Sequence, residues 1–189
     1  MNNIHPVYDK LVSREKKEQL LNQKGRVYWL YGPSGSGKTT VAIELETQFH
    51  MKGKYTVVLD GDNLRSGLNQ GLGFSTEDRL ENIRRASELA KIIVQNGAIV
   101  ICCFVCPLQS MRDLARQIIG EDFTEIYIKT SLETLIQRDT KGFYKKALEG
   151  NMDNLTGINA EFEESESMNL VIDTDRISVQ EGVTLILNC

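Results

Sequence analysis

Residues 32–40 combine glycine, lysine and hydroxyl side chains at a spacing suited to binding a phosphate. They read Gly-Pro-Ser-Gly-Ser-Gly-Lys-Thr-Thr, which fits the phosphate-loop pattern G-x-x-x-x-G-K-[ST]. Glycine permits backbone angles that turn successive N–H groups toward an anion, and a following helix adds its dipole. Lys38 can reach the β- and γ-phosphates, and the Thr39 hydroxyl can ligate Mg²⁺. The pattern therefore predicts a site for ATP and Mg²⁺, formed by Gly32, Ser34, Gly35, Ser36, Gly37, Lys38, Thr39 and Thr40.

Two carboxylates, Asp60 and Asp62, follow the next apolar segment, residues 55–59. One can hold Mg²⁺ or its water shell, and the other can accept a proton from an attacking hydroxyl. A plain polar turn would also explain the sequence Asp-Gly-Asp-Asn. The nearby phosphate loop favours the functional interpretation, because phosphoryl transfer uses both a metal ion and a proton acceptor.

An anion-binding group is indicated at the start of the longest helical pattern. Arg79 and Asn82 are three residues apart and so lie on one helix face, while Arg65 can supply a second guanidinium fork. A solvated helix face is the alternative. Phe74, just before the helix, can stack on a base or pack near Leu80 at the helix entry.

Residues 138–146 form the densest basic cluster of the chain, Arg-Asp-Thr-Lys-Gly-Phe-Tyr-Lys-Lys. Cations on a mobile segment can neutralise phosphate charge and exclude water during phosphoryl transfer. A solvated basic helix is the commoner meaning of such a run. Its place directly after the fourth strand and the helix that follows favours a closing lid.

Five apolar segments that read as strands alternate with helical patterns, which predicts a parallel sheet covered by helices. The strands are residues 26–31, 55–59, 98–105, 123–128 and 170–173, and the helices are 41–49, 75–95, about 108–119, 131–138 and 179–187. Ligands of such sheets bind at the carboxyl ends of the strands, where the phosphate loop and both carboxylates fall. We therefore expect a three-layer α/β fold of the P-loop NTPase type, with helices on both faces and a basic lid.

Length and composition indicate an ordinary globular protein. With 189 residues, 41% hydrophobic residues and a net charge of −4, we expect one P-loop domain, residues 26–189, preceded by a helical arm, residues 1–25. The acidic charge argues against a general nucleic-acid surface. No apolar stretch approaches the ~20 residues of a membrane span, and residues 1–10 lack a signal-peptide core, so we expect a cytoplasmic protein. Cys102, Cys103 and Cys106 suit packing in a reducing compartment better than a metal site.

With these residues in place, the chain resembles the adenylylsulfate kinases, or APS kinases, from about residue 5 to residue 188. The resemblance lies in residues 32–40, 59–65, 67–69, 72–75, 78–85, 138–147 and 156–158. It implies transfer of the γ-phosphate of ATP to the ribose 3′-hydroxyl of adenosine 5′-phosphosulfate. The product would be 3′-phosphoadenosine 5′-phosphosulfate, the activated sulfate donor of sulfate assimilation.

The resemblance also implies roles for individual residues. Asp62 would be the base and Asp60 would lie near Mg²⁺. Arg65, Arg79 and Asn82 would hold the phosphosulfate, and Phe74 would stack on its adenine. Further contacts would come from Arg138 on the nucleotide side, and from Val105, Lys141, Leu155 and Thr156 on the acceptor side. Family members are commonly homodimers.

The chain departs from the family pattern in three places. Cys106 stands before Pro107, where the family usually has a serine that is recorded as a phosphorylated intermediate. By its position, Cys106 is therefore counted among the candidate catalytic residues. An in-line displacement needs no covalent relay, so we expect activity without that serine. Leu155 replaces an aromatic residue that would close the other side of the adenine, where a base–aromatic stack contributes roughly 1–3 kcal/mol. Residues 161–163 read Glu-Phe-Glu in place of a common Pro-Tyr-Glu.

These departures leave two alternatives open. One is a related kinase for another nucleotide with a small acidic tail, of which cytidine diphosphoramidate is the first to test. The other is a regulatory protein that binds a nucleotide without turnover, although the Asn-Lys-x-Asp motif of switch GTPases does not occur in the sequence.

Overall fold

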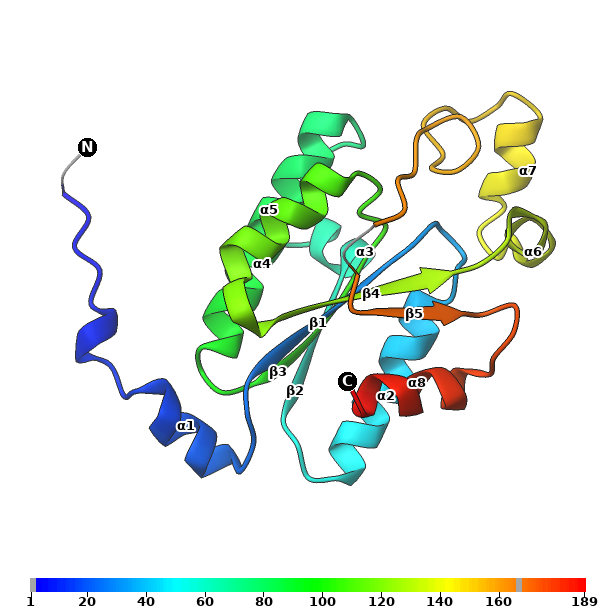
Figure 1. The fold of residues 1–189 in the computed structure, drawn as a ribbon. Coiled ribbons are helices and arrows are strands. Elements are labelled where there is room, and N and C mark those ends of the chain that lie inside the picture. Colours follow the sequence, from blue (N-terminus) through cyan, green and yellow to red (C-terminus); the bar gives the residue numbers. More distant parts are fainter. Residues whose placement is uncertain (1–2, 166–167) are drawn as a thin grey trace.

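Five parallel strands form one sheet at the centre of the computed structural model, which describes residues 3–165 and 168–189 (Figure 1). The order across the sheet is β2-β3-β1-β4-β5. The strands are β1 (Arg26–Tyr31), β2 (Thr56–Asp60), β3 (Ile99–Phe104), β4 (Phe123–Lys129) and β5 (Leu170–Asp173). Because every neighbouring pair is parallel, all the carboxyl ends meet at one edge.

Helices cover both faces of this sheet, as expected for the α/β class. Helices α4 (Thr76–Val94) and α5 (Gln109–Ile119) pack on one face, and α2 (Lys38–Met51) and α8 (Val179–Leu187) pack on the other. The shorter helices are α1 (Arg14–Leu21), α3 (Gly61–Arg65), α6 (Leu132–Arg138) and α7 (Phe143–Leu148).

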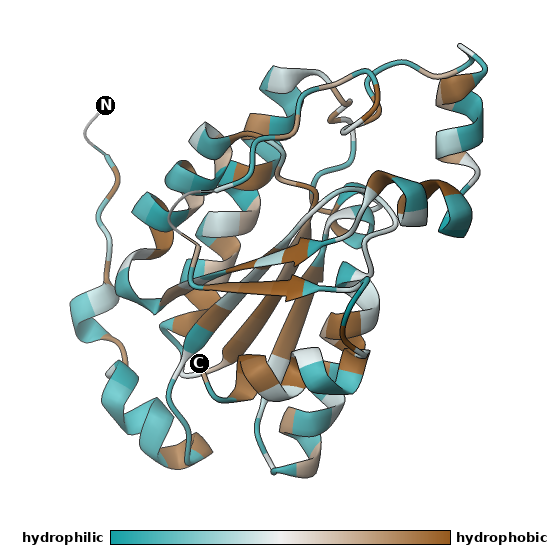
Figure 2. Ribbon diagram, turned by 45° about the vertical axis from the view of Figure 1, so that its right-hand side comes forward, coloured by the Kyte–Doolittle hydropathy of each residue, from teal (hydrophilic) through white to brown (hydrophobic). Residues whose placement is uncertain are grey.

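Alternate side chains of the inner strands fill two separate cores. In β1, Trp29 and Tyr31 face α4 and α5, whereas Tyr28 and Leu30 face α2 and α8. All of β3 is buried and apolar, and the strands of the sheet are largely hydrophobic (Figure 2). A strand buried on both faces reads as a near-continuous apolar run, which is why β3 was recognisable in the sequence.

A short helix that the sequence did not indicate, α3, follows β2. Its cap is Asp60, whose carboxylate accepts hydrogen bonds from the backbone N–H groups of Asp62 (2.9 Å) and Asn63 (3.4 Å). Helix α4 begins where expected, because Ser75 Oγ accepts from the N–H of Asp78 at 3.1 Å. Side-chain capping satisfies N–H groups that a helix leaves unpaired at its start. The Asp60 cap therefore also fixes where that carboxylate lies.

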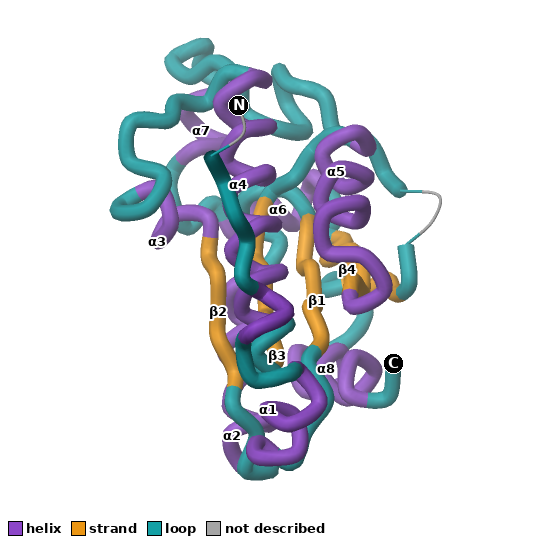
Figure 3. The backbone as a smooth tube through the Cα atoms, turned by 90° about the vertical axis from the view of Figure 1, so that its left-hand side faces the viewer, coloured by secondary structure: helices purple, strands orange, loops and turns teal. Residues whose placement is uncertain are grey.

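The N-terminal segment consists of two different parts. Helix α1 lies at the end of the sheet opposite to α3, α6 and α7 (Figure 3). Glu18, buried there, accepts hydrogen bonds from Arg14 Nε (2.8 Å) and the Gly25 N–H (3.0 Å), and Arg14 pairs with Asp122. Residues 3–12, by contrast, are exposed and extend away from the sheet (Figure 1).

No helix in residues 3–165 or 168–189 is both long enough and apolar enough to cross a membrane.

Candidate active site

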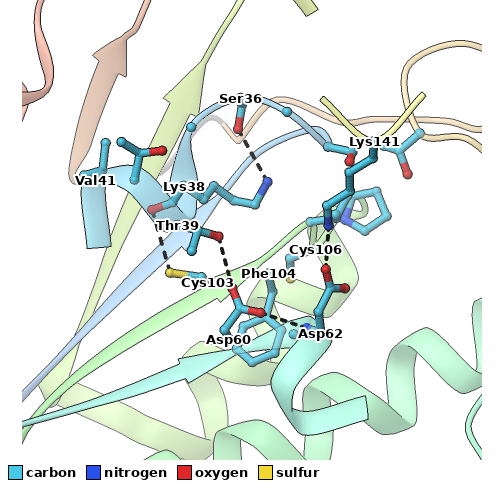
Figure 4. A pocket seen from close by; sticks show the side chains of 18 of the residues that line it. Ser36, Lys38, Thr39, Val41, Asp60, Asp62, Cys103, Phe104, Cys106 and Lys141 are labelled. Atoms are coloured by element: carbon cyan, nitrogen blue, oxygen red, sulfur yellow. Dashed lines mark hydrogen bonds and ion pairs between the residues drawn. The ribbon is translucent and has the colours of Figure 1, made fainter. Parts of the chain in front are cut away.

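A large cleft opens at the carboxyl ends of the strands (Figure 4). Its volume is about 1320 Å³, above the roughly 300–1,000 Å³ of a pocket for one small ligand, so it has room for two substrates. The structure brings nearly all of the sequence-predicted site residues into its lining. These are Ser34, Gly35, Ser36, Gly37, Lys38, Thr39, Thr40, Asp60, Asp62, Arg65, Phe74, Arg79, Asn82, Val105, Cys106, Arg138, Lys141, Leu155 and Thr156. Gly32 is outside the lining.

Gly32 instead allows the chain to leave β1 in close contact with β4. A Cβ atom at this position would lie 2.5 Å from the carbonyl oxygen of Ile128, so only glycine fits. Gly37, with φ of 97°, caps α2, which begins at Lys38. The loop between them is the predicted strand–loop–helix phosphate site.

Lys38 is buried inside this loop. Its Nζ donates hydrogen bonds to the carbonyl oxygens of Gly32 (2.9 Å) and Pro33 (2.7 Å). Burial lowers the pKa of Lys38 to about 8, because removal from water disfavours the charged amine. A phosphate in the loop would offer the ammonium group the negative charge that these carbonyls lack.

A pair of oxygen ligands suited to Mg²⁺ lies beside the phosphate loop (Figure 4). Thr39 Oγ1 donates to Asp60 Oδ2 at 3.1 Å. A hydroxyl and a carboxylate are the hard donors that Mg²⁺ prefers, and Mg²⁺ usually takes its other ligands from water and substrate phosphates. Within the described ranges no group of three or more His, Cys, Asp or Glu side chains could hold a metal. The Thr39–Asp60 pair fits a metal that takes its remaining ligands from a nucleotide and water.

The basic cluster, residues 138–146, comprises the end of α6, a turn and the start of α7. Each of these three parts contacts a residue of the cleft. Lys141 Nζ lies 2.5 Å from Asp62 Oδ2, so an ion pair joins the turn to the predicted base. Tyr144 Oη donates to the carbonyl oxygen of Ser34 at 2.7 Å, which ties α7 to the phosphate loop. Arg138 donates to the Thr174 hydroxyl at 3.0 Å, at the cleft edge. These contacts are those of a lid over the cleft.

The lid also has a small hydrophobic core. Leu155 is buried in it, together with Leu135, Tyr144 and Ala147. Thr156, also buried, forms a bridge with Ala160. The position where the family usually has an aromatic side chain therefore packs against the lid as well as lining the cleft.

Two arginines and an aromatic ring form another wall of the cleft. The Arg65 guanidinium lies 4.6 Å from the centre of the Phe74 ring, and that of Arg79 lies 5.7 Å from it. Arg79 donates to the carbonyl oxygens of Phe74 (3.0 Å) and Asn154 (3.1 Å). Burial lowers the pKa of both arginines. Phe74 remains 63% exposed, which leaves ring surface for a base.

Asn82 lies in the same wall, one helix turn beyond Arg79, and is buried. Its side-chain oxygen accepts a hydrogen bond from Asn69 Nδ2 at 2.9 Å. Asn69 lies within a stretch that matches the family motif, but nothing in the sequence gave it a role.

Cys106 occupies the loop after β3, with an unusual backbone. Its φ is +43°, which is uncommon for a residue other than glycine. The side chain belongs to the core that contains Trp29 and Met111 and is 2% exposed. Burial raises the pKa of the Cys106 thiol to about 12. The thiol is therefore protonated at neutral pH and is a poor nucleophile.

Arg112, on α5, was not singled out in the sequence. It is fully buried, and its Nη atoms donate to the carbonyl oxygens of Cys106 (2.9 Å) and Glu163 (2.7 Å). Its Nε lies 3.3 Å from the Glu125 carboxylate, and its guanidinium stacks over the Tyr31 ring at 4.6 Å. Arginine is almost never fully buried unless it is paired. The apolar periodicity of the sequence therefore gave no reason to expect Arg112 in the core. Arg112 joins the loop after β3 to the segment that returns from the lid.

Comparisons with known proteins agree with this geometry. The family model described as adenylylsulphate kinase matches residues 24–173. The adenylyl-sulfate kinase of Phocaeicola vulgatus is 50% identical over 186 residues, covering 98% of this chain and 91% of that protein. That of Bacteroides thetaiotaomicron is 46% identical over 187 residues, covering 98% and 93%.

A solved structure has the same architecture. The Mycobacterium tuberculosis APS kinase CysC, in complex with AMPPNP and APS, superposes with a TM-score of 0.84 at 39% identity. The match covers 88% of this chain and 97% of that one. By sequence, fold and site, the chain belongs to the adenylylsulphate kinase family.

Proposed function

We propose that this protein is an adenylyl-sulfate kinase that transfers the γ-phosphoryl group of ATP to the 3′-hydroxyl of adenosine 5′-phosphosulfate, a step of sulfate assimilation. The products are 3′-phosphoadenosine 5′-phosphosulfate and ADP. One observation carries the proposal: a phosphate loop, a hydroxyl–carboxylate pair, a second carboxylate and an arginine wall share one cleft. Membership of the family and the likeness to a kinase solved with AMPPNP and APS support it.

On the ATP side, the loop amides and Lys38 hold the phosphates, and Arg138 contributes a cation at the cleft edge. Thr39 and Asp60 would hold Mg²⁺, which would neutralise charge on the phosphates. Tyr144 holds helix α7 against the phosphate loop. In that position α7 covers the nucleotide site and excludes water from it.

On the acceptor side, Arg65, Arg79 and Asn82 hold the phosphosulfate, while Phe74 contacts the adenine. Val105, Leu155 and Thr156 complete the acceptor pocket. Asp62 accepts the proton of the 3′-hydroxyl as its oxygen bonds to the γ-phosphorus and the bond to the β-phosphate oxygen of ADP breaks. For this, Lys141 must move from Asp62 toward the phosphates when both substrates bind.

In this mechanism no phosphorylated enzyme forms at Cys106, because its buried, protonated thiol is a poor nucleophile. Transfer is then a single in-line step between the two bound nucleotides. We also propose that the enzyme works in the cytoplasm as a homodimer, which light scattering of the purified protein would test.

An acceptor panel tests the proposal. The protein is incubated with Mg-ATP and adenosine 5′-phosphosulfate, AMP, CMP or cytidine diphosphoramidate, and phosphorus NMR locates the new phosphate. We expect a 3′-phosphate on adenosine 5′-phosphosulfate, and no product with Lys38→Ala. ATP binding without product from any acceptor would refute the kinase assignment.

The cytidine acceptor is included for a specific reason. Leu155 keeps apolar contact but cannot stack on adenine as an aromatic residue would, and it packs against the lid. Product from the cytidine compound alone would move the assignment to that substrate class.

A further inference from the structure

Asn69 is a fully buried amide next to the wall of the cleft that contains Arg65, Arg79 and Asn82. It lies in the loop between α3 and α4, and its backbone N–H donates to the carbonyl oxygen of Leu64 at 2.7 Å. Its side-chain nitrogen donates to Asn82 Oδ1 at 2.9 Å. Asn82 lines the cleft, whereas Asn69 does not. Asn69 therefore touches a candidate substrate residue from behind.

Stability gives no reason for the oxygen of this amide. The oxygen Oδ1 of Asn69 is buried and has no hydrogen-bond partner among the described residues. A buried acceptor without a partner costs folding free energy, which an apolar side chain of the same size would avoid. What the amide supplies is the hydrogen bond to Asn82.

In the structure the Asn82 amide has the orientation in which its oxygen faces Asn69. With Asn82 Oδ1 bonded to Asn69, the NH₂ group is the end that Asn82 offers to the cleft, beside Arg79. An NH₂ group attracts an anion, and the carbonyl oxygen of a flipped amide would repel it.

We propose that Asn69 is a positioning residue that orients Asn82, so that its NH₂ group donates a hydrogen bond to the anionic tail of the acceptor. The inference rests on the proposed function, because Asn82 must contact the acceptor. It adds a residue that has no contact with either nucleotide but determines acceptor affinity.

Two substitutions that keep the number and branching of the side-chain heavy atoms test this. Asn69→Leu removes both the donor and the orphan acceptor, and Asn69→Asp leaves a group that cannot donate when ionised. We expect the KM for adenosine 5′-phosphosulfate to rise about tenfold in Asn69→Leu and further in Asn69→Asp, because one charge-assisted hydrogen bond is lost. The KM for ATP should stay within about twofold. The Tm of Asn69→Leu should lie within a few degrees of the wild type, because the substitution removes the orphan oxygen of Asn69 but leaves Asn82 Oδ1 without its donor.

A double-mutant cycle separates orientation from general damage. In an Asn82→Ala background, Asn69→Leu should not raise the acceptor KM further, because no amide remains to orient. The matched control is Gln70→Leu, which removes an exposed amide from the same loop and should leave both KM values unchanged.

Several results would overturn the inference. They are an unchanged acceptor KM, an equal rise in both KM values, an additive effect in the Asn82→Ala background, or failure of Asn69→Leu to fold. The proposed function is judged separately, by whether the wild-type protein phosphorylates adenosine 5′-phosphosulfate at all.

Discussion

At the scale of single residues, the buried ammonium group of Lys38 predicts how nucleotide affinity depends on pH. Its pKa is lowered to about 8 in the free protein, and bound phosphates would favour the charged form and raise it. Above pH 8 the amine of Lys38 is mostly neutral in the free protein, and it must take up a proton when ATP binds. This proton uptake weakens the apparent affinity for ATP as the pH rises. The KM for Mg-ATP should therefore rise only about twofold from pH 7.0 to 8.0 and by up to about tenfold per pH unit above that.

Steady-state kinetics between pH 7.0 and 9.5 check this prediction. The KM for the acceptor serves as an internal control, because Arg65 and Arg79, which hold its anionic tail, stay protonated throughout. A KM for ATP that stays flat to pH 9.5 would contradict the prediction.

The buried thiol of Cys106 makes a second prediction at this scale. Cys106→Ser and Cys106→Ala should both keep kcat within about threefold of the wild type, because in-line transfer uses no enzyme nucleophile. Incubation with radiolabelled ATP alone should leave no label on the wild-type protein. If no phosphate is transferred until Cys106→Ser is introduced, the single-step mechanism is wrong.

At the scale of elements, Arg112 ties helix α5 to two loops that line or frame the cleft. It bonds the carbonyl oxygens of Cys106 and Glu163 and lies against Glu125, and neither Arg112 nor Glu125 has any solvent exposure. Breaking a buried ion pair leaves a charge without compensation and costs about 3–5 kcal/mol. We expect Arg112→Met to lower the free energy of unfolding toward the lower end of that range, because Glu125 keeps Arg116 as a partner.

Urea denaturation measures this loss, and an exposed arginine provides the matched control. Arg84 pairs with Glu81 at 2.7 Å on the outer face of α4 and is about half exposed. Because exposed ion pairs contribute only about 0–1 kcal/mol, Arg84→Met should change stability far less. Equal losses in the two variants would show that Arg112 is not a structural tie.

At the scale of the whole molecule, the sequence predicted what depends on local pattern and missed what depends on packing across elements. The strands and the phosphate loop were recognisable because β3 is one apolar run and residues 32–40 match a specific motif. Asn69 and Arg112 were not, because each is paired with a side chain 13 residues away, Asn82 and Glu125 respectively. A polar residue that is buried by distant contacts has the same local pattern as one on the surface.

The N-terminal segment, expected as one arm of residues 1–25, provides the last prediction. Residues 3–12 are exposed, whereas α1 is fastened to the base of the sheet through Arg14, which pairs with Asp122, and through Lys17, which donates to Asn96 at 2.6 Å. Removal of residues 1–12 should therefore leave the free energy of unfolding nearly unchanged. Removal of residues 1–22 should lower it by roughly 3 kcal/mol, since several hydrogen bonds of about 1 kcal/mol each are lost.

Both truncated proteins should keep the wild-type kcat, because α1 lies at the opposite end of the sheet from the lid and α3 (Figure 3). Urea denaturation and the kinase assay measure the two quantities on the same preparations. Equal destabilisation by the two truncations would mean that residues 1–12 are also part of the folded unit. A loss of kcat with the shorter truncation would mean that the arm acts on the site, and light scattering would then show whether it does so through a second subunit.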